Sequence, residues 1–264
     1  MNGQQNEIRS VTIVGSGNVA EALARALGDG PFELRGVLAR NEARGREGAR
    51  IGRTAWTDDP ARLAASDLCI VAVSDRAVAE AAAALPCGVA GAVVHTAGCV
   101  PLEALPACFG ARGVLYPLQT FTRGRAVELS EVPFFTEASD EAFALRLDAF
   151  ARAAGGAVLR ADSAQRRRIH LAGVFACNFV NAMYGAAGRV LRDADIPFDV
   201  LGPIIRETAA KAAASGDPAS VQTGPAVRGD RATQERHCEL LADDPELTTI
   251  YKLISEQIWR ISKK

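Results

Sequence analysis

The sequence predicts an α/β fold, a doubly wound and mainly parallel sheet, followed by an all-α helical domain. Near-continuous apolar runs, such as residues 11–14 and 68–73, alternate with helical segments over the first 162 residues, which is typical of parallel strands covered on both faces. A glycine-rich turn joins the first strand to the first helix. After Asp162 the strand signal disappears. We therefore predict two domains, residues 1–162 and residues 163–264.

In the first domain, continuous apolar runs predict strands, and apolar residues at helical spacing predict helices. The helix at 140–154 shows the pattern well, because Phe143, Leu147 and Phe150 share one face and Gly155 ends it. Strands are predicted at 11–14, 34–39, 68–73, 92–96, 113–116, 132–136 and 157–161, and helices at 21–27, 59–65, 76–85 and 140–154. In the second domain one long helix, 163–192, precedes three or four others.

Composition excludes several classes of function. The 264 residues are 48% hydrophobic and 23% charged, with a formal net charge of −1, which gives no electrostatic attraction toward nucleic acid or anionic membrane. The first ten residues lack an apolar signal core, and no 18-residue window is uninterruptedly apolar, so we expect no membrane span. The six cysteines show no CxxC pair, and no residues have metal-ligand spacing. We expect reduced thiols, no metal and a cytoplasmic location.

The turn after the first strand fits the pattern G-x-G-x-x-A. The first glycine permits a tight turn, the second lets a pyrophosphate approach bare backbone, and the small last residue allows close packing of helix and strand. The helix N-terminus then offers free N–H groups to the phosphates. The alternative is a glycine turn without a ligand. The residues predicted to bind a dinucleotide here are Gly15, Ser16, Gly17, Asn18 and Val19.

The residue at the end of the second strand distinguishes NAD from NADP, because an acidic residue there would bind the ribose of NAD. This sequence has Arg40 and Asn41 there, with Arg44 and Arg46 soon after. A guanidinium pairs with a 2′-phosphate, so we expect NADP rather than NAD. The alternative is that these arginines form a solvated helix face.

The third strand ends at Val73, Ser74 and Asp75, where side chains at a strand's carboxyl end face a cofactor. Ser74 either bonds the cofactor or, like Asp75, only caps the next helix.

Hydride transfer to a carbonyl or imine needs a proton donor, and histidine titrates nearest neutral pH. His95 ends a predicted strand, and His170 opens the long helix on a stripe with Asn178 and Asn181. That polar stripe either faces a substrate or is a satisfied polar seam between helices. Further substrate-binding candidates are Gln119 and Thr120, at the end of another strand, and Arg228, in a turn-rich segment that precedes Asp230, an expected helix N-cap.

Together, the motifs "GSGNVA", "HTAG", "YPLQTF", "HLAGVFACNFVNAMY" and "TGPAVRGD" resemble those of a bacterial Rossmann-like family of NADP-dependent oxidoreductases with a C-terminal domain of unknown function. The resemblance implies a helical domain similar to the 6-phosphogluconate dehydrogenase C-terminal domain, kinship with pyrroline-5-carboxylate and ketopantoate reductases, and a homodimer formed through the helical domain. The chain departs from the related β-hydroxyacid dehydrogenases, which place a lysine four residues before the asparagine that Asn178 matches. Here that position is Val174, and residues 1–210 contain no lysine.

We therefore expect an NADP-dependent oxidoreductase that transfers a hydride to or from a small carbonyl, imine or hydroxy acid bound between the domains. His95, His170 and Asn178 are its candidate catalytic residues. The alternative, prompted by the missing lysine, is a protein that binds NADP(H) as a regulatory sensor without turnover.

Overall fold

The computed structural model describes residues 7–263, so most of the polar N-terminal segment lies outside the described residues. The chain divides into two compact units, Met1–Asn178 and Phe179–Lys264. The predicted boundary at Asp162 coincides with the N-cap of a helix, α5 (Ser163–Gly173), which is fixed by a capping box between Asp162 and Gln165. The first unit continues beyond that cap along the helix.

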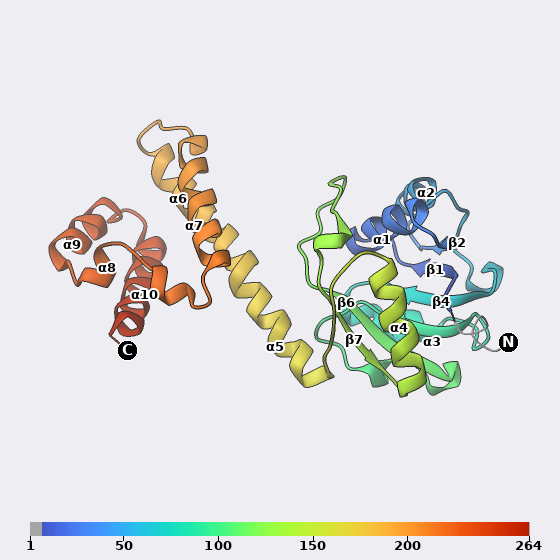
Figure 1. Ribbon diagram of the computed structural model, residues 1–264. Helices are drawn as coiled ribbons and strands as arrows, with labels where there is room; N and C mark the ends of the chain where they lie inside the picture. The colour runs from blue at the N-terminus through green and yellow to red at the C-terminus, as the bar shows by residue number, and fades with distance from the viewer. Residues whose placement is uncertain (1–6, 264) are drawn as a thin grey trace. The chain divides into compact units, whose positions relative to one another are not determined.

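An eight-stranded sheet forms the centre of the first unit (Figure 1), with the order β3-β2-β1-β4-β5-β6-β7-β8. All neighbouring pairs are parallel except β6 and β7, which are antiparallel. The prediction of a mainly parallel, doubly wound sheet is confirmed. The strands are β1 (Ser10–Val14), β2 (Glu33–Leu38), β3 (Trp56–Thr57), β4 (Ser66–Val71), β5 (Ala90–His95), β6 (Ala111–Pro117), β7 (Phe134–Ala138) and β8 (Val158–Arg160).

Helices cover both faces of this sheet. One apolar cluster joins Leu23 of α1 (Asn18–Asp29), Ala49 of α2 (Glu42–Ile51) and Phe143 of α4 (Glu141–Ala153) to one face. A second cluster joins Val78 of α3 (Val78–Ala83) to the other face, where alternate strand residues such as Cys69 point. The carboxyl ends of β1, β2 and β4 therefore meet at one edge, which positions the site described below.

Two elements beside the second strand, α2 and β3, are absent from the sequence prediction. The helix α2 contains Gly45 and Gly48 among charged residues, so it has no clear apolar stripe. Gly45 is required by packing, because a Cβ there would lie 2.1 Å from Nε1 of Trp56 in β3. The helix predicted at 59–65 is only a 3₁₀ turn, Pro60–Arg62.

A continuous helix runs from Ser163 to Arg192, as predicted, and contains a π-helical turn, Val174–Phe179, between α5 and α6 (Val180–Arg192). It is long and apolar enough to cross a membrane by length and composition alone. The remaining helices of the second unit are α7 (Gly202–Ala214), α8 (Pro225–Arg228), α9 (Arg231–Leu240) and α10 (Pro245–Ser262).

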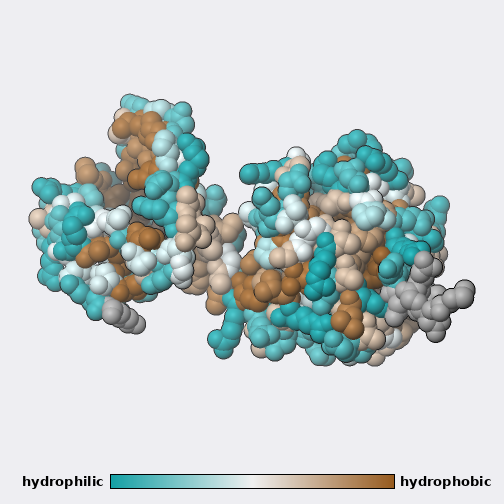
Figure 2. Space-filling model, viewed as in Figure 1, coloured by the Kyte–Doolittle hydropathy of each residue, from teal (hydrophilic) through white to brown (hydrophobic). Residues whose placement is uncertain are grey.

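The second unit has a small core. Within its described residues, those that are buried are Ala226, Leu247 and Ser255. Figure 2 shows apolar surface over α6, α7 and the turn between them. Large apolar side chains exposed in this unit include Val190, Ile196, Phe198, Val200, Ile204, Leu240, Leu253, Ile254, Trp259 and Ile261.

The expectation that all six cysteines are reduced thiols is wrong for two of them. Cys87, before β5, and Cys108, in a 3₁₀ turn before β6, form a disulfide with their Cα atoms 5.6 Å apart. Sequence spacing did not reveal the pair because its members lie 21 positions apart. The other four cysteines are free, and burial raises the pKa of the Cys69 thiol to about 12.

Candidate functional site

The glycine-rich turn between β1 and α1 has the backbone geometry that its pattern predicts. Gly15 has φ +129°, and its N–H donates to the carbonyl of Leu38 at 2.8 Å. A Cβ at Gly15 would lie 2.2 Å from the carbonyl oxygen of Ala72, so only glycine fits. Gly17 is the N-cap of α1, and a Cβ there would meet nothing within 4 Å. Open space therefore faces the first N–H groups of α1.

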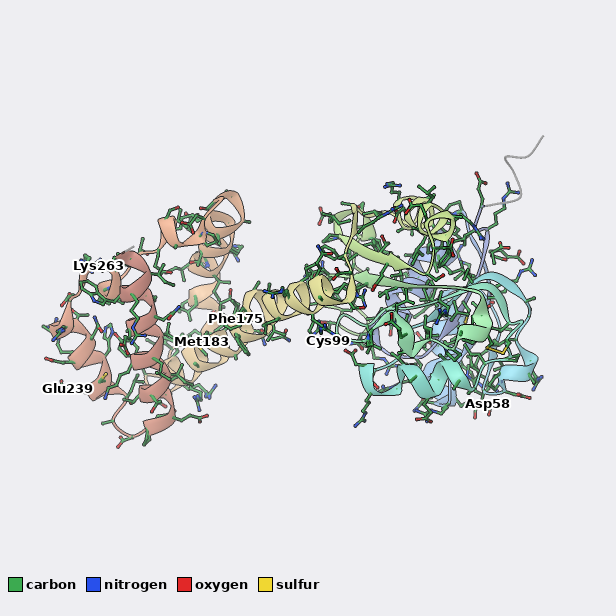
Figure 3. The ribbon with its side chains drawn as sticks, turned by 90° about the horizontal axis from the view of Figure 1, so that it is seen from below. Asp58, Cys99, Phe175, Met183, Glu239 and Lys263 are labelled. Carbon is green, nitrogen blue, oxygen red and sulfur yellow. A yellow bond between two sulfur atoms is a disulfide. The ribbon has the colours of Figure 1, made fainter. Side chains whose placement is uncertain are left out.

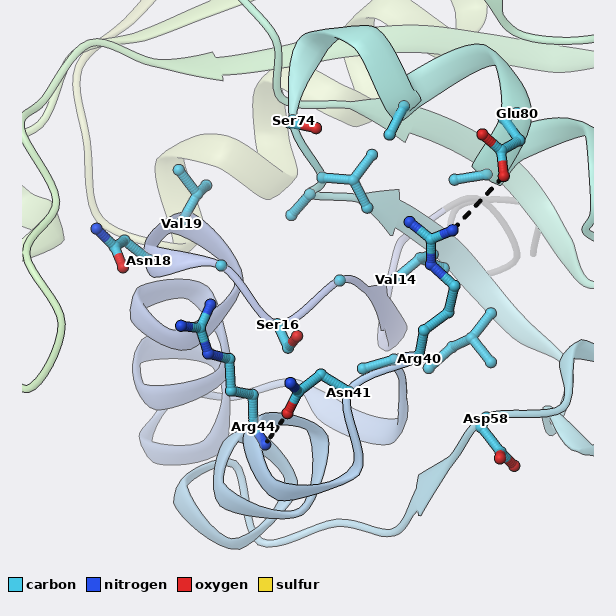
Figure 4. A pocket seen from close by; sticks show the side chains of 18 of the residues that line it. Val14, Ser16, Asn18, Val19, Arg40, Asn41, Arg44, Asp58, Ser74 and Glu80 are labelled. Carbon is cyan, nitrogen blue, oxygen red and sulfur yellow. Dashed lines mark hydrogen bonds and ion pairs between the residues drawn. The ribbon is translucent and has the colours of Figure 1, made fainter.

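That open space is a pocket of about 820 Å³ (Figure 4), large enough for an extended small-molecule ligand. It collects segments from the carboxyl ends of β1, β2 and β4. All of the predicted cofactor-binding residues except Asp75 line it. These are Gly15, Ser16, Gly17, Asn18, Val19, Arg40, Asn41, Val73 and Ser74, and the predicted substrate-binding residue Gln119 joins them.

The two arginines of the pocket have different surroundings. Figure 4 shows Arg40 reaching toward Glu80 and Arg44 reaching toward Ser16. The guanidinium of Arg40 lies 3.6 Å from the Glu80 carboxylate, and both side chains are largely exposed. The guanidinium of Arg44 makes no hydrogen bond or ion pair with any residue that the structure describes. Its backbone N–H donates to Asn41 Oδ1 at 3.0 Å, which caps α2.

Ser74 precedes the 3₁₀ turn Asp75–Ala77, and its side chain makes no capping hydrogen bond there. Its hydroxyl therefore remains available in the pocket. The carboxylates that line the same pocket are those of Asp58 and Glu80.

His95 is completely buried at the end of β5. Its Nε2 lies 3.3 Å from the carbonyl oxygen of Pro101, and its Nδ1 accepts the Ala97 N–H at 3.2 Å. Burial, together with the charge of Arg166, lowers the pKa of His95 to about 4. The ring is therefore neutral at physiological pH, and backbone groups occupy both of its nitrogens.

His170 is half-buried on α5 and contacts the end of β6. Its Nδ1 lies 3.1 Å from the Tyr116 hydroxyl, and Gly98 lies beneath both rings. Burial, with the charges of Cys99 and Asp75, raises the pKa of Tyr116 to about 12. Figure 3 shows Cys99 near the start of the long helix. Tyr116 is not among the residues predicted from the sequence, although its place at the end of a strand was a usable signal.

Gln119 and Thr120 lie near the start of a loop of residues 118–128 that follows β6. Thr120 is exposed, and its N–H donates to Gln119 Oε1 at 2.8 Å. The loop returns to the glycine-rich turn, where Asn18 Nδ2 donates to the carbonyl of Phe121 at 2.8 Å.

The remaining predicted residues lie on helices. Asn178 and Asn181 are exposed on the long helix, Asn178 in the first unit and Asn181 in the second. Arg228 is exposed at the end of α8, where Gly229 has φ +67°. Asp230 accepts the Thr233 N–H and caps α9, as predicted. Among residues 7–263, no three His, Cys, Asp or Glu side chains form a group that could hold a metal ion.

Comparison with known proteins connects this geometry to a family. Residues 132–258 match the family model described as Domain of unknown function (DUF2520). A solved structure from Bacteroides fragilis, described as a putative NADP oxidoreductase, is 38% identical with a TM-score of 0.85, over 97% of this chain and 99% of that one. The chain belongs to this family of Rossmann-like NADP oxidoreductases. The family resemblance inferred from the motifs is confirmed, and the protein is an oxidoreductase.

More distant structures share the fold of this oxidoreductase. A reductive aminase from Aspergillus terreus, solved with NADPH and ethyl-5-oxohexanoate, is 17% identical with a TM-score of 0.67, over 97% of this chain and 98% of that one. A 1-pyrroline-5-carboxylate reductase from Streptococcus pyogenes is 12% identical with a TM-score of 0.65, over 97% and 100%. A comparison with curated proteins gave no match.

Proposed function

We propose that this oxidoreductase transfers a hydride between NADP(H) and a small carbonyl, imine or hydroxy-acid substrate. The observation that carries the proposal is the pocket in which three features meet: the glycine-rich turn, Arg44, whose guanidinium has no partner among the described residues, and the ends of three parallel strands. This combination suits a dinucleotide with an additional phosphate.

Each end of the pocket offers groups suited to a phosphate of NADP. Gly17 leaves the first turn of α1 open, so backbone N–H groups are available to the pyrophosphate. The ribose end of the pocket carries Arg40, Asn41 and Arg44. Glu80 lies opposite and pairs with Arg40. Asp58 is the other acidic residue of the lining, and Figure 4 shows it away from Arg44.

When bound, NADPH supplies the hydride, and the protein must supply a proton to the reduced oxygen or nitrogen. We assign that proton to His170, whose ring is half-buried and accessible, rather than to the enclosed His95. The Tyr116 hydroxyl lies 3.1 Å from Nδ1 of His170 and holds the ring by this contact, which leaves Nε2 to deliver the proton. Tyr116 then orients His170, and Gln119 contributes an amide for the substrate.

Calorimetry with NADPH and NADH, followed by NADPH oxidation with aldehyde, 2-keto-acid and imine panels, tests the proposal. We expect NADPH to bind more tightly than NADH, and at least one panel to be reduced. His170→Asn should lower kcat at least a hundredfold with NADPH affinity unchanged. Absence of binding by either coenzyme would overturn the proposal. Tight NADPH binding without reduction of any panel would instead favour a regulatory sensor.

We further propose that the protein is a homodimer, formed through the second unit. That unit buries few side chains of its own and exposes apolar ones along α6, α7 and α10, and a surface of that kind is typical of an interface. Light scattering after size exclusion should give twice the 27.8 kDa chain mass. Ile204→Glu should produce monomers, whereas Leu145→Glu, on the exposed face of α4, should not. A monomeric wild type would contradict the proposal.

The proposed partners are thus a small-molecule substrate and a second copy of the chain. We place the reaction in the cytoplasm, because it draws on the intracellular pool of NADPH. A fusion to a fluorescent protein should therefore distribute through the cell interior, and accumulation at the envelope would contradict this location.

A further inference from the structure

The loop after β6, residues 118–128, crosses the first turn of α1, and we call it the strap. Two hydrogen bonds hold it there. Asn18 Nδ2 donates to the carbonyl of Phe121 at 2.8 Å, and the Gly124 N–H donates to Glu21 Oε1 at 3.0 Å. About 100 residues separate each pair along the chain, so the strap is fixed by tertiary contacts with the helix that begins the dinucleotide pocket.

Interactions made by the strap's own residues also fix its conformation. The Arg125 N–H donates to the carbonyl of Thr122 at 3.1 Å, closing a turn in which Gly124 has φ +73°. A positive φ at that position favours glycine. Phe121 is partly buried and packs against the core cluster that contains α1. The turn therefore presents the intervening residue, Arg123, at a defined place.

Arg123 lies at a second, small recess beside the pocket. Gly15, Ser16, Glu21 and Arg44 line this recess together with Arg123, so two guanidinium groups and one carboxylate border one space next to the glycine-rich turn. Arg44 also lines the main pocket. Because its guanidinium has no partner in the described chain, it is free to bind an anion.

The charges around Arg123 leave its guanidinium available. Its Nε lies 3.8 Å from Glu21 Oε2, a loose ion pair, and the side chain is half-exposed. Glu21 is shared, because Arg25 lies 3.8 Å from its other oxygen. Glu47, on α2, is also close enough to feel the charge of Arg123, and it pairs with Arg50. At 3.8 Å the contact with Glu21 is too long for a hydrogen bond, so the hydrogen-bond donors of Arg123 remain available.

We propose that Arg123, carried by the strap, pairs with Arg44 to bind the 2′-phosphate of NADP and so determines the preference for NADP over NAD. This inference rests on the proposed function. A 2′-phosphate carries nearly two negative charges and three acceptor oxygens, which two guanidinium groups satisfy better than one. Ser16 adds a hydroxyl donor on the same side. Arg40 reaches to the opposite side of the pocket, toward Glu80.

The test compares ligands that differ only in the phosphate. Calorimetry measures binding of NADPH, NADH, 2′,5′-ADP and 5′-ADP to the wild type, Arg123→Ala and Arg44→Ala. We expect each variant to bind NADPH and 2′,5′-ADP at least tenfold more weakly, with NADH and 5′-ADP changed less than twofold. Arg125→Ala is the matched control, because it removes an exposed arginine of the same strap that lines neither space.

The outcomes separate this inference from the proposed function. An equal loss of 2′,5′-ADP and 5′-ADP would mean that Arg123 contacts the diphosphate, and it would overturn the inference. An unchanged NADPH-to-NADH ratio in Arg123→Ala would do the same. If the wild type bound neither coenzyme, the proposed function itself would fail. Thermal melting of each variant checks folding, and Arg123→Lys, which keeps the charge but not the planar fork, should fall between wild type and Arg123→Ala.

Discussion

The hydroxyl of Tyr116 lies 3.1 Å from Nδ1 of His170, and Gly98 packs against both side chains. The pair joins the end of β6 to the first helix beyond the sheet, across 54 residues of sequence. Because Gly98 contacts both side chains, a substitution at this position tests the proposed proton donor.

Gly98→Ala should disable the pair without touching the coenzyme pocket. Its Cβ would lie 2.9 Å from Nδ1 of His170 and 2.9 Å from Cζ of Tyr116, so one ring must move. We expect kcat to fall at least tenfold while NADPH affinity stays within twofold, measured by steady-state kinetics and calorimetry. Gly88→Ala, at a site with no neighbour within 4 Å, is the control. Wild-type kcat in Gly98→Ala would argue against His170 as the donor.

His95 should make stability depend on pH. Its pKa is about 4 in the folded protein, against 6.5 for an unperturbed histidine. Between these values the unfolded chain binds a proton that the folded protein does not. Stability is therefore complete above pH 6.5 and declines as pH falls toward 4, by on the order of 3 kcal/mol. Urea unfolding from pH 7.5 to 4.5 measures it, and a decline of equal size in His95→Asn would contradict the assignment.

The Arg40–Glu80 pair should oppose coenzyme binding weakly. The groups are 3.6 Å apart and exposed, and such pairs contribute little to stability, so Arg40 is easily released. We expect Glu80→Gln to tighten NADPH binding by a few-fold, measured by fluorescence titration. Glu42→Gln, which removes an exposed carboxylate paired with Arg46 outside the pocket, should leave affinity unchanged. Weaker NADPH binding in Glu80→Gln would mean that Glu80 itself supports the bound coenzyme.

The Cys87–Cys108 disulfide should stabilise the first unit. It closes a loop with a sequence separation of 21, for which chain entropy predicts about 3 kcal/mol. Reduction, or Cys87→Ser, should lower Tm by several degrees, whereas Cys99→Ser should not. Thiol titration of the denatured, unreduced protein should find four thiols. Six thiols would show that the two side chains are neighbours without a bond.

The sequence was sufficient for the sheet and for the glycine-rich turn that borders the pocket, because their signals are local. Gly15 and Gly17 sit within one short turn, and Arg40 and Asn41 follow directly from the end of a recognisable strand. The sequence did not predict helix α2 because Gly45 and Gly48 break its apolar pattern, and Gly45 is needed there for close packing against Trp56.

Residues whose role depends on distant partners could not be found in this way. Nothing near Tyr116 in the sequence indicates His170, and nothing near Arg123 indicates Arg44. His95 was selected correctly as the end of a strand, but its burial and its backbone partners depend on the path of residues 97–101. The spacing of residues along the sequence does not show which side chains will be buried by a loop.

The scarcity of buried side chains in the second unit has a thermodynamic consequence. Ordering a helical segment costs conformational entropy that only removal of apolar surface from water can offset. Ala226 and Leu247 are the buried apolar residues of its described part, so in the homodimer that we propose this region gains its cohesion from association. Subunit separation and loss of helical structure should then occur as a single event, and the melting temperature should rise as the protein is concentrated.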